Sequence, residues 1–370
     1  MFPGKPFRVV IFVFAILCLP TFCSADTSIN DQAKSLWKQG QQFIEKFALP
    51  NEPILNQPIP DPPPAPPPSP LKTDKQGIYG IAIGHSAQQL QETWGNPQRI
   101  DPHPLGYEWW IYNKDLDHYV QVAIKDGKVT EIYSNAPTWS FRGIQIDSSK
   151  KELLDAFPIE KTISFIYENV KVNVDNNVDG KLLFLIDEQP VLFYLDLHRE
   201  QRVTAIRFLS QEALVKGSFF NRNFTYTGQK PSLTKASLND EQQDKLELSM
   251  AKQIFDLTNV IRQRYNLPVL KWNEEAARVA RSHSSDMVTH QFFDHISKTT
   301  GMDPFERMKA AGLHYKTAGE NIAYGQNDGI EALEGWMNSE GHRKNILHTP
   351  FTTLGVGVKD NYYTQNFVTP

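Results

Sequence analysis

Imidazole and carboxylate groups gather in the last third of the chain. Six of the ten histidines follow position 250. Neutral imidazoles and carboxylates are the side chains that bind divalent metals or transfer protons near neutral pH. This part of the sequence has no His-Glu-x-x-His motif and no cysteine, so it lacks a compact zinc signature. Any site must therefore combine side chains from separated segments.

Two pairs in this region have helical spacing but do not complete a catalytic set. His283 and Asp286 lie three residues apart on an expected helix, which favours a local polar pair. Ser339 and His342 have the same spacing. However, the sequence contains no Gly-x-Ser-x-Gly motif and shows no group that would orient this histidine. A serine hydrolase is therefore not indicated.

Alternating helices and strands must position these side chains. Asn273 and Asp303 are typical helix N-caps, and Pro304 suits a first helical position. The pattern predicts helices at 274–289, 304–311 and 329–338 and strands at 354–358 and 362–368. A long helix from Asp240 to Tyr265 precedes them, with apolar residues on one face. This order predicts a C-terminal α/β/α sandwich.

Five ordered blocks in this region carry a family resemblance. They are FFDHIS, GENIAYG, EGWMNSEGHRKNIL, LGVGV and YYTQNFV. In this order they resemble the bacterial branch of the CAP family, the cysteine-rich secretory, antigen 5 and pathogenesis-related proteins with an SCP domain. The resemblance covers Leu248 to Pro370 and implies the CAP fold. The preceding residues 77–215 resemble the CAP-associated N-terminal domain.

The CAP resemblance implies a central cavity lined by two histidines and two acidic residues. The first histidine corresponds to His295 in FFDHIS, and the first acid corresponds to Glu320 in GENIA. At the second acidic and second histidine positions of animal and plant members, this chain has Ser339 and Tyr362. The tetrad of those members is therefore not intact here.

Bacterial members carry Gly-His-Arg instead, so His342 is expected to face the same cavity. The adjacent Glu340 is the fourth candidate. The implied ligand-binding set is therefore His295, Glu320, His342 and Glu340. A divalent cation, zinc or calcium, is one occupant that this resemblance allows, with His295 and His342 as its ligands.

Three functions remain open for this cavity and its partner domain. The favoured one is a non-catalytic extracellular binding module for a divalent cation, a small lipid or a wall-derived ligand, because no nucleophile motif is present. The second is a structural or interaction protein that binds a protein partner through residues 77–215. The third is a metal-dependent hydrolase or peptidase with Glu320 as base, although two histidines are fewer than the three protein ligands usual at catalytic zinc.

The N-terminus predicts export. Lys5 and Arg8 precede an apolar run from Val9 to Leu19, and Cys23-Ser24-Ala25 suits a cleavage site, which gives a signal peptide at 1–25. The run is shorter than the ~20 residues of a membrane-spanning helix. We expect a secreted, extracellular or cell-surface protein that contacts a membrane only through this segment if it is uncleaved. Both cysteines lie in it, so the mature chain would contain none.

Composition divides the remaining chain. We predict an amphipathic helix in 26–49, a proline-rich linker at 50–76 that holds 11 of the 25 prolines, the CAP-associated domain at 77–215, a second linker at 216–245 and the CAP domain at 246–370. The net charge of −4 does not indicate a nucleic-acid-binding surface.

Residues 77–215 contain an internal duplication. The run GIAIGHS at 80–86 is echoed by GIQIDSS at 143–149. Each copy predicts a short strand, a serine-capped helix and then a hairpin, and Asp126-Gly127 is a strong hairpin turn. The sequence therefore predicts an α+β protein, in which an α+β domain of two duplicated strand-helix-hairpin units precedes the CAP sandwich.

Overall fold

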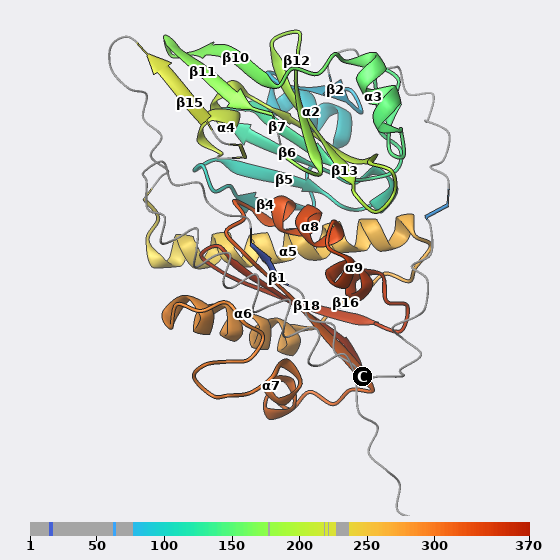
Figure 1. The fold of residues 1–370 in the computed structure, drawn as a ribbon, viewed down its shortest axis with the longest axis vertical. Coiled ribbons are helices and arrows are strands. Elements are labelled where there is room, and N and C mark those ends of the chain that lie inside the picture. The colour runs from blue at the N-terminus through green and yellow to red at the C-terminus, as the bar shows by residue number, and fades with distance from the viewer. Residues whose placement is uncertain are drawn as a thin grey trace, which may run out of the picture. The chain divides into compact units, whose positions relative to one another are not determined.

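The computed structural model describes residues 15–17, 62–63, 77–176, 178–217, 219–220, 222–226 and 237–370. The helix predicted in 26–49 lies outside the described residues, as do most of the predicted signal peptide at 1–25 and of the linker at 50–76. The chain divides into two compact units (Figure 1), and each is described by itself. Unit 1 includes 250–258 and 267–370, and unit 2 spans 62–249 and 259–266.

Unit 2 is a β-rich N-terminal domain built on a seven-stranded antiparallel sheet. Its strand order is β12-β13-β14-β7-β6-β5-β4. Asp126 and Gly127 join β6 to β7 with φ values of 50° and 71°, as the predicted hairpin turn requires. The strands are β4 (Arg99–Pro102), β5 (Glu108–Tyr112), β6 (Val120–Lys125), β7 (Lys128–Ser134), β12 (Lys181–Ile186), β13 (Gln189–Asp196) and β14 (Arg202–Leu209).

Two short hairpins in this domain each lead into a capped helix. Strands β2 (Gly77–Ile78) and β3 (Ile81–Ala82) precede α2 (Ala87–Trp94), and strands β8 (Ser140–Phe141) and β9 (Ile144–Gln145) precede α3 (Lys150–Ala156). Both helices begin with a capping box, from Ser86 and from Ser149. The two segments with related sequences therefore begin with the same local structure.

A separate three-stranded sheet completes the N-terminal domain. It has the order β10 (Thr162–Tyr167), β11 (Val170–Asp175), β15 (Arg222–Tyr226), and the domain also contains η1 (Leu116–His118) and α4 (Gln211–Lys216). Strand β15 falls inside 216–245, where the sequence predicts a linker. It pairs antiparallel with β11, which satisfies its backbone groups. The structure differs from the prediction here because a polar strand at a sheet edge has the composition of a loop.

The C-terminal domain is a three-layered sandwich. Its sheet has the order β1-β17-β19-β18-β16, with α6 and α7 on one face and α8 and α9 on the other (Figure 1). The predicted α/β/α sandwich is therefore confirmed. Its elements are α5 (Asp240–Arg264, of which 250–258 lie in this unit), α6 (Glu274–Thr289), α7 (Pro304–Ala310), α8 (Gly329–Met337), α9 (Glu340–Leu347), β1 (Ala15–Leu17), β16 (Lys271–Trp272), β17 (Thr317–Tyr324), β18 (Thr353–Lys359) and β19 (Tyr362–Thr369).

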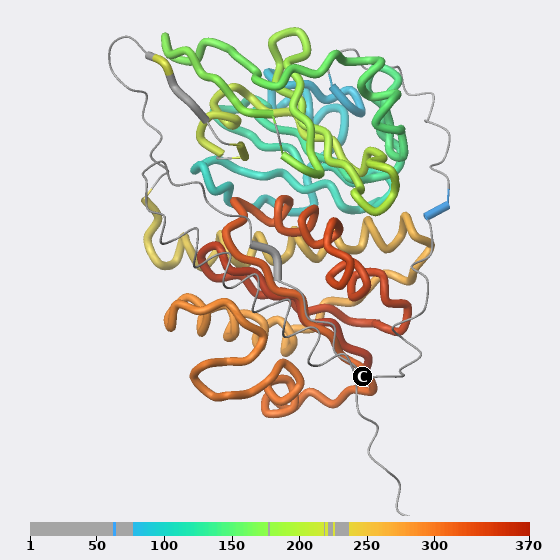
Figure 2. Tube along the Cα trace, in the orientation of Figure 1, coloured from blue at the N-terminus to red at the C-terminus, as the bar shows by residue number. Residues whose placement is uncertain are grey.

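Local sequence fixes where α6 and α7 begin. The Asn273 side chain accepts a hydrogen bond from Ala276 N, and Asp303 accepts from Phe305 N and Glu306 N. Apart from β1, the domain consists of residues 250–258 and 267–370, coloured from yellow-orange to red in Figure 2. Among the described residues, no helix combines the length and apolar character needed to span a membrane.

Two glycines of the LGVGV block bring α6 close to the sheet. A Cβ atom at Gly355 would lie 2.1 Å from Ala277 N, and one at Gly357 would lie 2.0 Å from Arg281 N. Both positions on β18 therefore require glycine for helix and strand to pack at this distance. This packing holds α6 against the sheet and so positions His283, which is buried in the domain interior.

Candidate functional site

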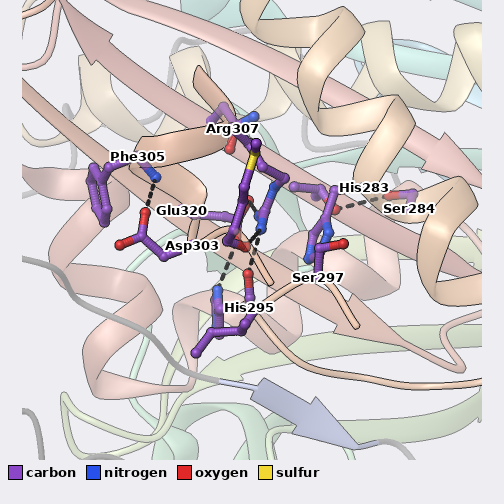
Figure 3. A network of polar contacts seen from close by, with 12 residues as sticks. His283, Ser284, His295, Ser297, Asp303, Phe305, Arg307 and Glu320 are labelled. Carbon is purple, nitrogen blue, oxygen red and sulfur yellow. Dashed lines mark hydrogen bonds and ion pairs between the residues drawn. The ribbon is translucent and has the colours of Figure 1, made fainter. Parts of the chain in front are cut away.

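A buried carboxylate joins β17, α7 and the loop after α6. Glu320 Oε1 lies 2.8 Å from His295 Nδ1, and Glu320 Oε2 accepts a hydrogen bond from Arg307 Nη2 at 2.7 Å (Figure 3). Arg307 also donates through Nη1 to the carbonyl oxygens of His295 and Met302. Glu320 is fully buried, and His295 is 3% exposed. These contacts hold the histidine loop against α7 and the sheet.

Glu320 is ionised at neutral pH. Burial alone would raise the pKa of this carboxyl, but the positive charge of Arg307 and the neighbouring histidines outweigh burial and lower it to about 2. An ionised carboxylate accepts hydrogen bonds only, so His295 donates from Nδ1. The Nε2 atom of His295 has no hydrogen-bond partner among the described residues. One imidazole nitrogen is therefore committed to the carboxylate and the other is available.

His283 belongs to the same cluster. Its Nε2 lies 2.9 Å from Asp294 O, which as a carbonyl can only accept, so Nε2 carries the proton. Its Nδ1 has no partner within the described part of the chain. Burial lowers the pKa of His283 to about 4, although the negative charge of Glu320 acts to raise it. At neutral pH the ring is therefore uncharged and presents an acceptor at Nδ1.

His342 is buried near His295. Its Nδ1 lies 2.9 Å from Ser339 Oγ. Burial lowers its pKa well below the ordinary histidine value, and interaction with His295 lowers it further. Glu340, in contrast, is 64% exposed and pairs with Lys344 at 2.6 Å. The structure thus brings His295, Glu320 and His342 into one region and leaves Glu340 at the surface.

An amide network positions the GENIA strand. Asn345 Nδ2 donates to Glu320 O at 3.2 Å and to Asn321 Oδ1 at 2.8 Å. Asn321 Nδ2 donates to His342 O at 3.2 Å. A Cβ at Gly319 would lie 3.0 Å from Asn345 Oδ1, so this glycine admits the amide. The network ties α9 to β17 and fixes the backbone of Glu320.

A cavity of about 330 Å³ lies between α6, α7 and the loop that joins them. His283 and Arg307 line it, whereas His295, Glu320 and His342 are not among its lining residues. The cavity therefore reaches the buried cluster through one neutral imidazole and one guanidinium.

The cluster does not fit a divalent cation. Both oxygens of Glu320 already accept hydrogen bonds, and the positively charged guanidinium of Arg307 lies beside one of them. Within the described ranges, no three His, Cys, Asp or Glu side chains are grouped to hold a metal ion. The unused nitrogens of His283 and His295 have free lone pairs, but a cation also needs compensating negative charge, and Arg307 already neutralises Glu320.

Sequence reasoning missed two residues of the cluster. It did not single out Arg307, and it placed His283 in a local pair with Asp286, which instead contacts Ser297, Thr299 and His290. The sequence around Arg307 gives only indirect information about this residue. Asp303 fixes where α7 begins and therefore which face of the helix Arg307 occupies. Its partner Glu320 lies on a different element, so no local spacing reveals the contact.

The sandwich and its buried histidine–glutamate pair define the class of an SCP-type domain. A family model described as "Cysteine-rich secretory protein family" matches residues 255–369, and one described as "CAP-associated N-terminal" matches residues 83–220. The chain is also 33% identical over 291 residues to the uncharacterized membrane protein YlbC of Bacillus subtilis, covering 77% of this chain and 82% of that protein. This chain therefore belongs to the CAP family and carries its CAP-associated N-terminal domain.

Further relatives agree with this assignment. The uncharacterized protein YkwD of Bacillus subtilis is 48% identical over 119 residues, which cover 32% of this chain and 46% of YkwD. A crystal structure of an extracellular protein with an SCP domain from Bacillus anthracis matches with a TM-score of 0.73 and 33% identity, covering 81% of this chain and 96% of that one. A cysteine-rich secretory protein from Staphylococcus aureus shares the fold, with a TM-score of 0.66 at 22% identity, covering 78% and 94%.

Proposed function

We propose that this protein is a non-catalytic extracellular binding module that takes a small organic ligand, lipid or wall-derived, into the cavity between α6 and α7. The main support is that two polar side chains that line this cavity each have a buried atom without a hydrogen-bond partner among the described residues, His283 Nδ1 and Arg307 Nε. Buried polar atoms are rarely left without partners unless a ligand or water completes them.

The electrostatics of Glu320 argue against the hydrolase alternative. A general base works best with a pKa near the operating pH. Burial alone would raise the pKa of Glu320, but the charge of Arg307 outweighs burial and lowers the pKa to about 2. Both carboxylate oxygens are also already in contact with hydrogen-bond donors. This carboxylate would be a weak base at neutral pH. It is suited instead to holding Arg307 and His295 in place.

An extracellular location supports this role. The predicted signal peptide at 1–25, of which residues 15–17 form β1 in the uncleaved chain, favours export, as does the extracellular description of the Bacillus anthracis relative. The membrane description of YlbC favours a cell-surface position. A duplicated N-terminal domain would then act as a second, independent module. Its two similar helix starts at Ser86 and Ser149 support the duplication.

Ligand-observed NMR on the full-length chain tests the proposal, with soluble wall digests and short-chain lipids as the mixtures screened. Ser282 is exposed and lines the cavity, so Ser282→Phe should block it, while Ser285→Phe on the same helix is the matched control. We expect saturation-transfer signals from at least one component, lost in Ser282→Phe and kept in Ser285→Phe. Signals that are absent, or equal in all three proteins, would rule out a ligand in this cavity.

A further inference from the structure

Two residues that line the cavity each have a buried atom without a hydrogen-bond partner among the described residues, an acceptor on His283 and a donor on Arg307. His283 is 1% exposed, and its Nδ1 carries a lone pair because Nε2 donates to Asp294 O. The Arg307 side chain is 10% exposed, and its Nε–H has no partner among the described residues although its Nη atoms are engaged. A ligand that satisfies both must carry a donor and an acceptor.

The charges around the cavity favour a neutral ligand. Arg307 pairs with Glu320, and Arg278 pairs with Glu275 at the exposed rim. The carboxylate of Asp286 accepts from the hydroxyls of Ser297 and Thr299. Each ionic group that lines the cavity therefore already has a partner of its own. An ionic ligand would have to displace one of these partners, which costs free energy.

The rest of the wall includes apolar side chains. Val279 and Met302 line the cavity together with Ala310 and Ala311. Such a surface accepts a methyl group or a hydrocarbon ring face. The volume of about 330 Å³ is near the lower end of the roughly 300–1,000 Å³ of small-molecule sites. The cavity therefore suits a ligand of the size of one sugar ring or one amino-acid unit.

We infer that this cavity recognises an amide of the acetamido type, an inference that rests on the proposed binding function. The amide N–H donates to His283 Nδ1, the amide carbonyl accepts from Arg307 Nε–H, and the methyl group packs against Val279 and Met302. A hydroxyl or an amide supplies both a donor and an acceptor, and an acetamido group adds the methyl group that the apolar part of the wall accepts. N-acetylated sugars and N-acylated peptides both carry it.

Three probes separate these sources: N-acetylglucosamine, glucosamine without the acyl group, and N-acetylalanine methylamide. Each is titrated by NMR into the full-length chain. His283→Gln is the principal variant, because the glutamine amide can still donate to Asp294 O while its own acceptor, Oε1, does not occupy the Nδ1 position. Ser282→Phe blocks the cavity from an exposed position, so it tests the same site if His283→Gln fails to fold. Ser285→Phe is the control.

We expect at least one acetamido probe to bind, at least tenfold more weakly in His283→Gln and Ser282→Phe and equally in Ser285→Phe, and glucosamine to leave the spectrum unchanged. Binding of the sugar alone or of the peptide mimic alone identifies the source. Failure of both acetamido probes, or unchanged affinity in His283→Gln, overturns the inference. If wall digests still bind in that case, the proposed function stands and only the amide assignment falls. If nothing binds, both fall.

Discussion

Each domain contains a buried glutamate held by an arginine and a histidine, and the two clusters differ in how completely they are closed. In the N-terminal domain, Glu131 Oε2 accepts from Arg207 Nε and Nη2 at 3.1 and 2.7 Å. Its Oε1 accepts from Tyr107 OH at 2.5 Å and lies 3.0 Å from His103 Nε2. In the C-terminal domain, Glu320 makes one contact through each oxygen.

The surroundings extend this difference. His103 accepts from Leu105 N through Nδ1 and stacks on Tyr107 at 3.9 Å, and Arg207 lies 4.4 Å from the Phe219 ring centroid. The Nδ1 atom of this imidazole is therefore engaged, its Nε2 lies beside Glu131, and its face is covered. Around Glu320, in contrast, His283 and Arg307 line a cavity with one unused atom each.

The comparison shows that residue types alone do not identify a binding site. The same three types make a sealed structural cluster in one domain and an open cluster in the other. Burial raises the pKa of each glutamate, and its arginine and histidine neighbours outweigh burial and lower it to about 2 in both cases. The cavity that His283 and Arg307 line is what distinguishes the site around Glu320.

The largest expected effect is on the closed cluster. Glu131→Gln removes the negative charge that faces the fully buried Arg207, which should lower the free energy of unfolding by about 3–5 kcal/mol. Glu320→Gln should cost about 1.5–3 kcal/mol, because Arg307 is partly exposed and keeps two carbonyl acceptors. Native-state hydrogen exchange at β7 and β17 reads each domain separately. Equal losses in the two domains would remove the distinction between closed and open clusters.

Acid should destabilise the C-terminal domain first. Burial lowers the pKa of His283 to about 4 and that of His342 well below its ordinary value, so the unfolded chain binds these protons more readily. Stability is therefore lost as pH falls from 6.5 towards 4, by about 3 kcal/mol for His283. The stability that the ionised Glu131 contributes to the N-terminal domain is lost only as pH falls below about 4.5 towards 2.

Calorimetry between pH 7 and pH 4.5 checks the acid effect. His283→Gln, which cannot titrate, should unfold with a smaller drop in melting temperature than the parent chain across this range. Identical drops in both proteins would show that His283 is not the buried neutral group described here.

A matched arginine pair sharpens the comparison further. Arg307→Lys keeps a positive charge near Glu320 but removes Nε and the forked donors. We expect ligand binding to weaken about tenfold, the 1.4 kcal/mol of one lost hydrogen bond. Arg207→Lys in the closed cluster should leave ligand affinity unchanged. The two affinities are measured by NMR titration, and weakening by Arg207→Lys as well would contradict a site confined to the C-terminal domain.

The smallest effect is expected at Glu340. This residue is 64% exposed, and its pair with Lys344 is a surface pair. Glu340→Ala should change the free energy of unfolding by less than about 0.5 kcal/mol and leave ligand affinity unaltered. Urea denaturation and the same titration check this. A clear loss of affinity would return Glu340 to the site that the family resemblance implies.

Sequence was a good guide where the signal is local. Asn273 and Asp303 begin their helices as their capping chemistry predicts, and Asp126-Gly127 forms the predicted turn. Local hydrogen bonds decide these features, and they need no knowledge of the rest of the fold. Strand β15 was not predicted because its pairing with β11, about 50 residues away, is a tertiary contact.

The site itself was only partly predictable. Resemblance pointed to His295 and Glu320, which are in contact at 2.8 Å. The roles of Arg307 and His283 depend on which way α7 and α6 face after packing. The close approach at Gly355 and Gly357 sets that geometry for α6, and helical periodicity alone cannot distinguish a buried polar residue from an exposed one.

The most direct test of an open site is the ¹⁵N spectrum of the His283 ring in the full-length chain, recorded through long-range couplings at pH 7 with and without N-acetylglucosamine or N-acetylalanine methylamide. We predict a proton on Nε2, a bare Nδ1, and a change in the Nδ1 resonance when the binding probe is added. A protonated Nδ1, or an Nδ1 resonance unmoved by saturating amounts of both probes, would contradict an acceptor that faces the ligand.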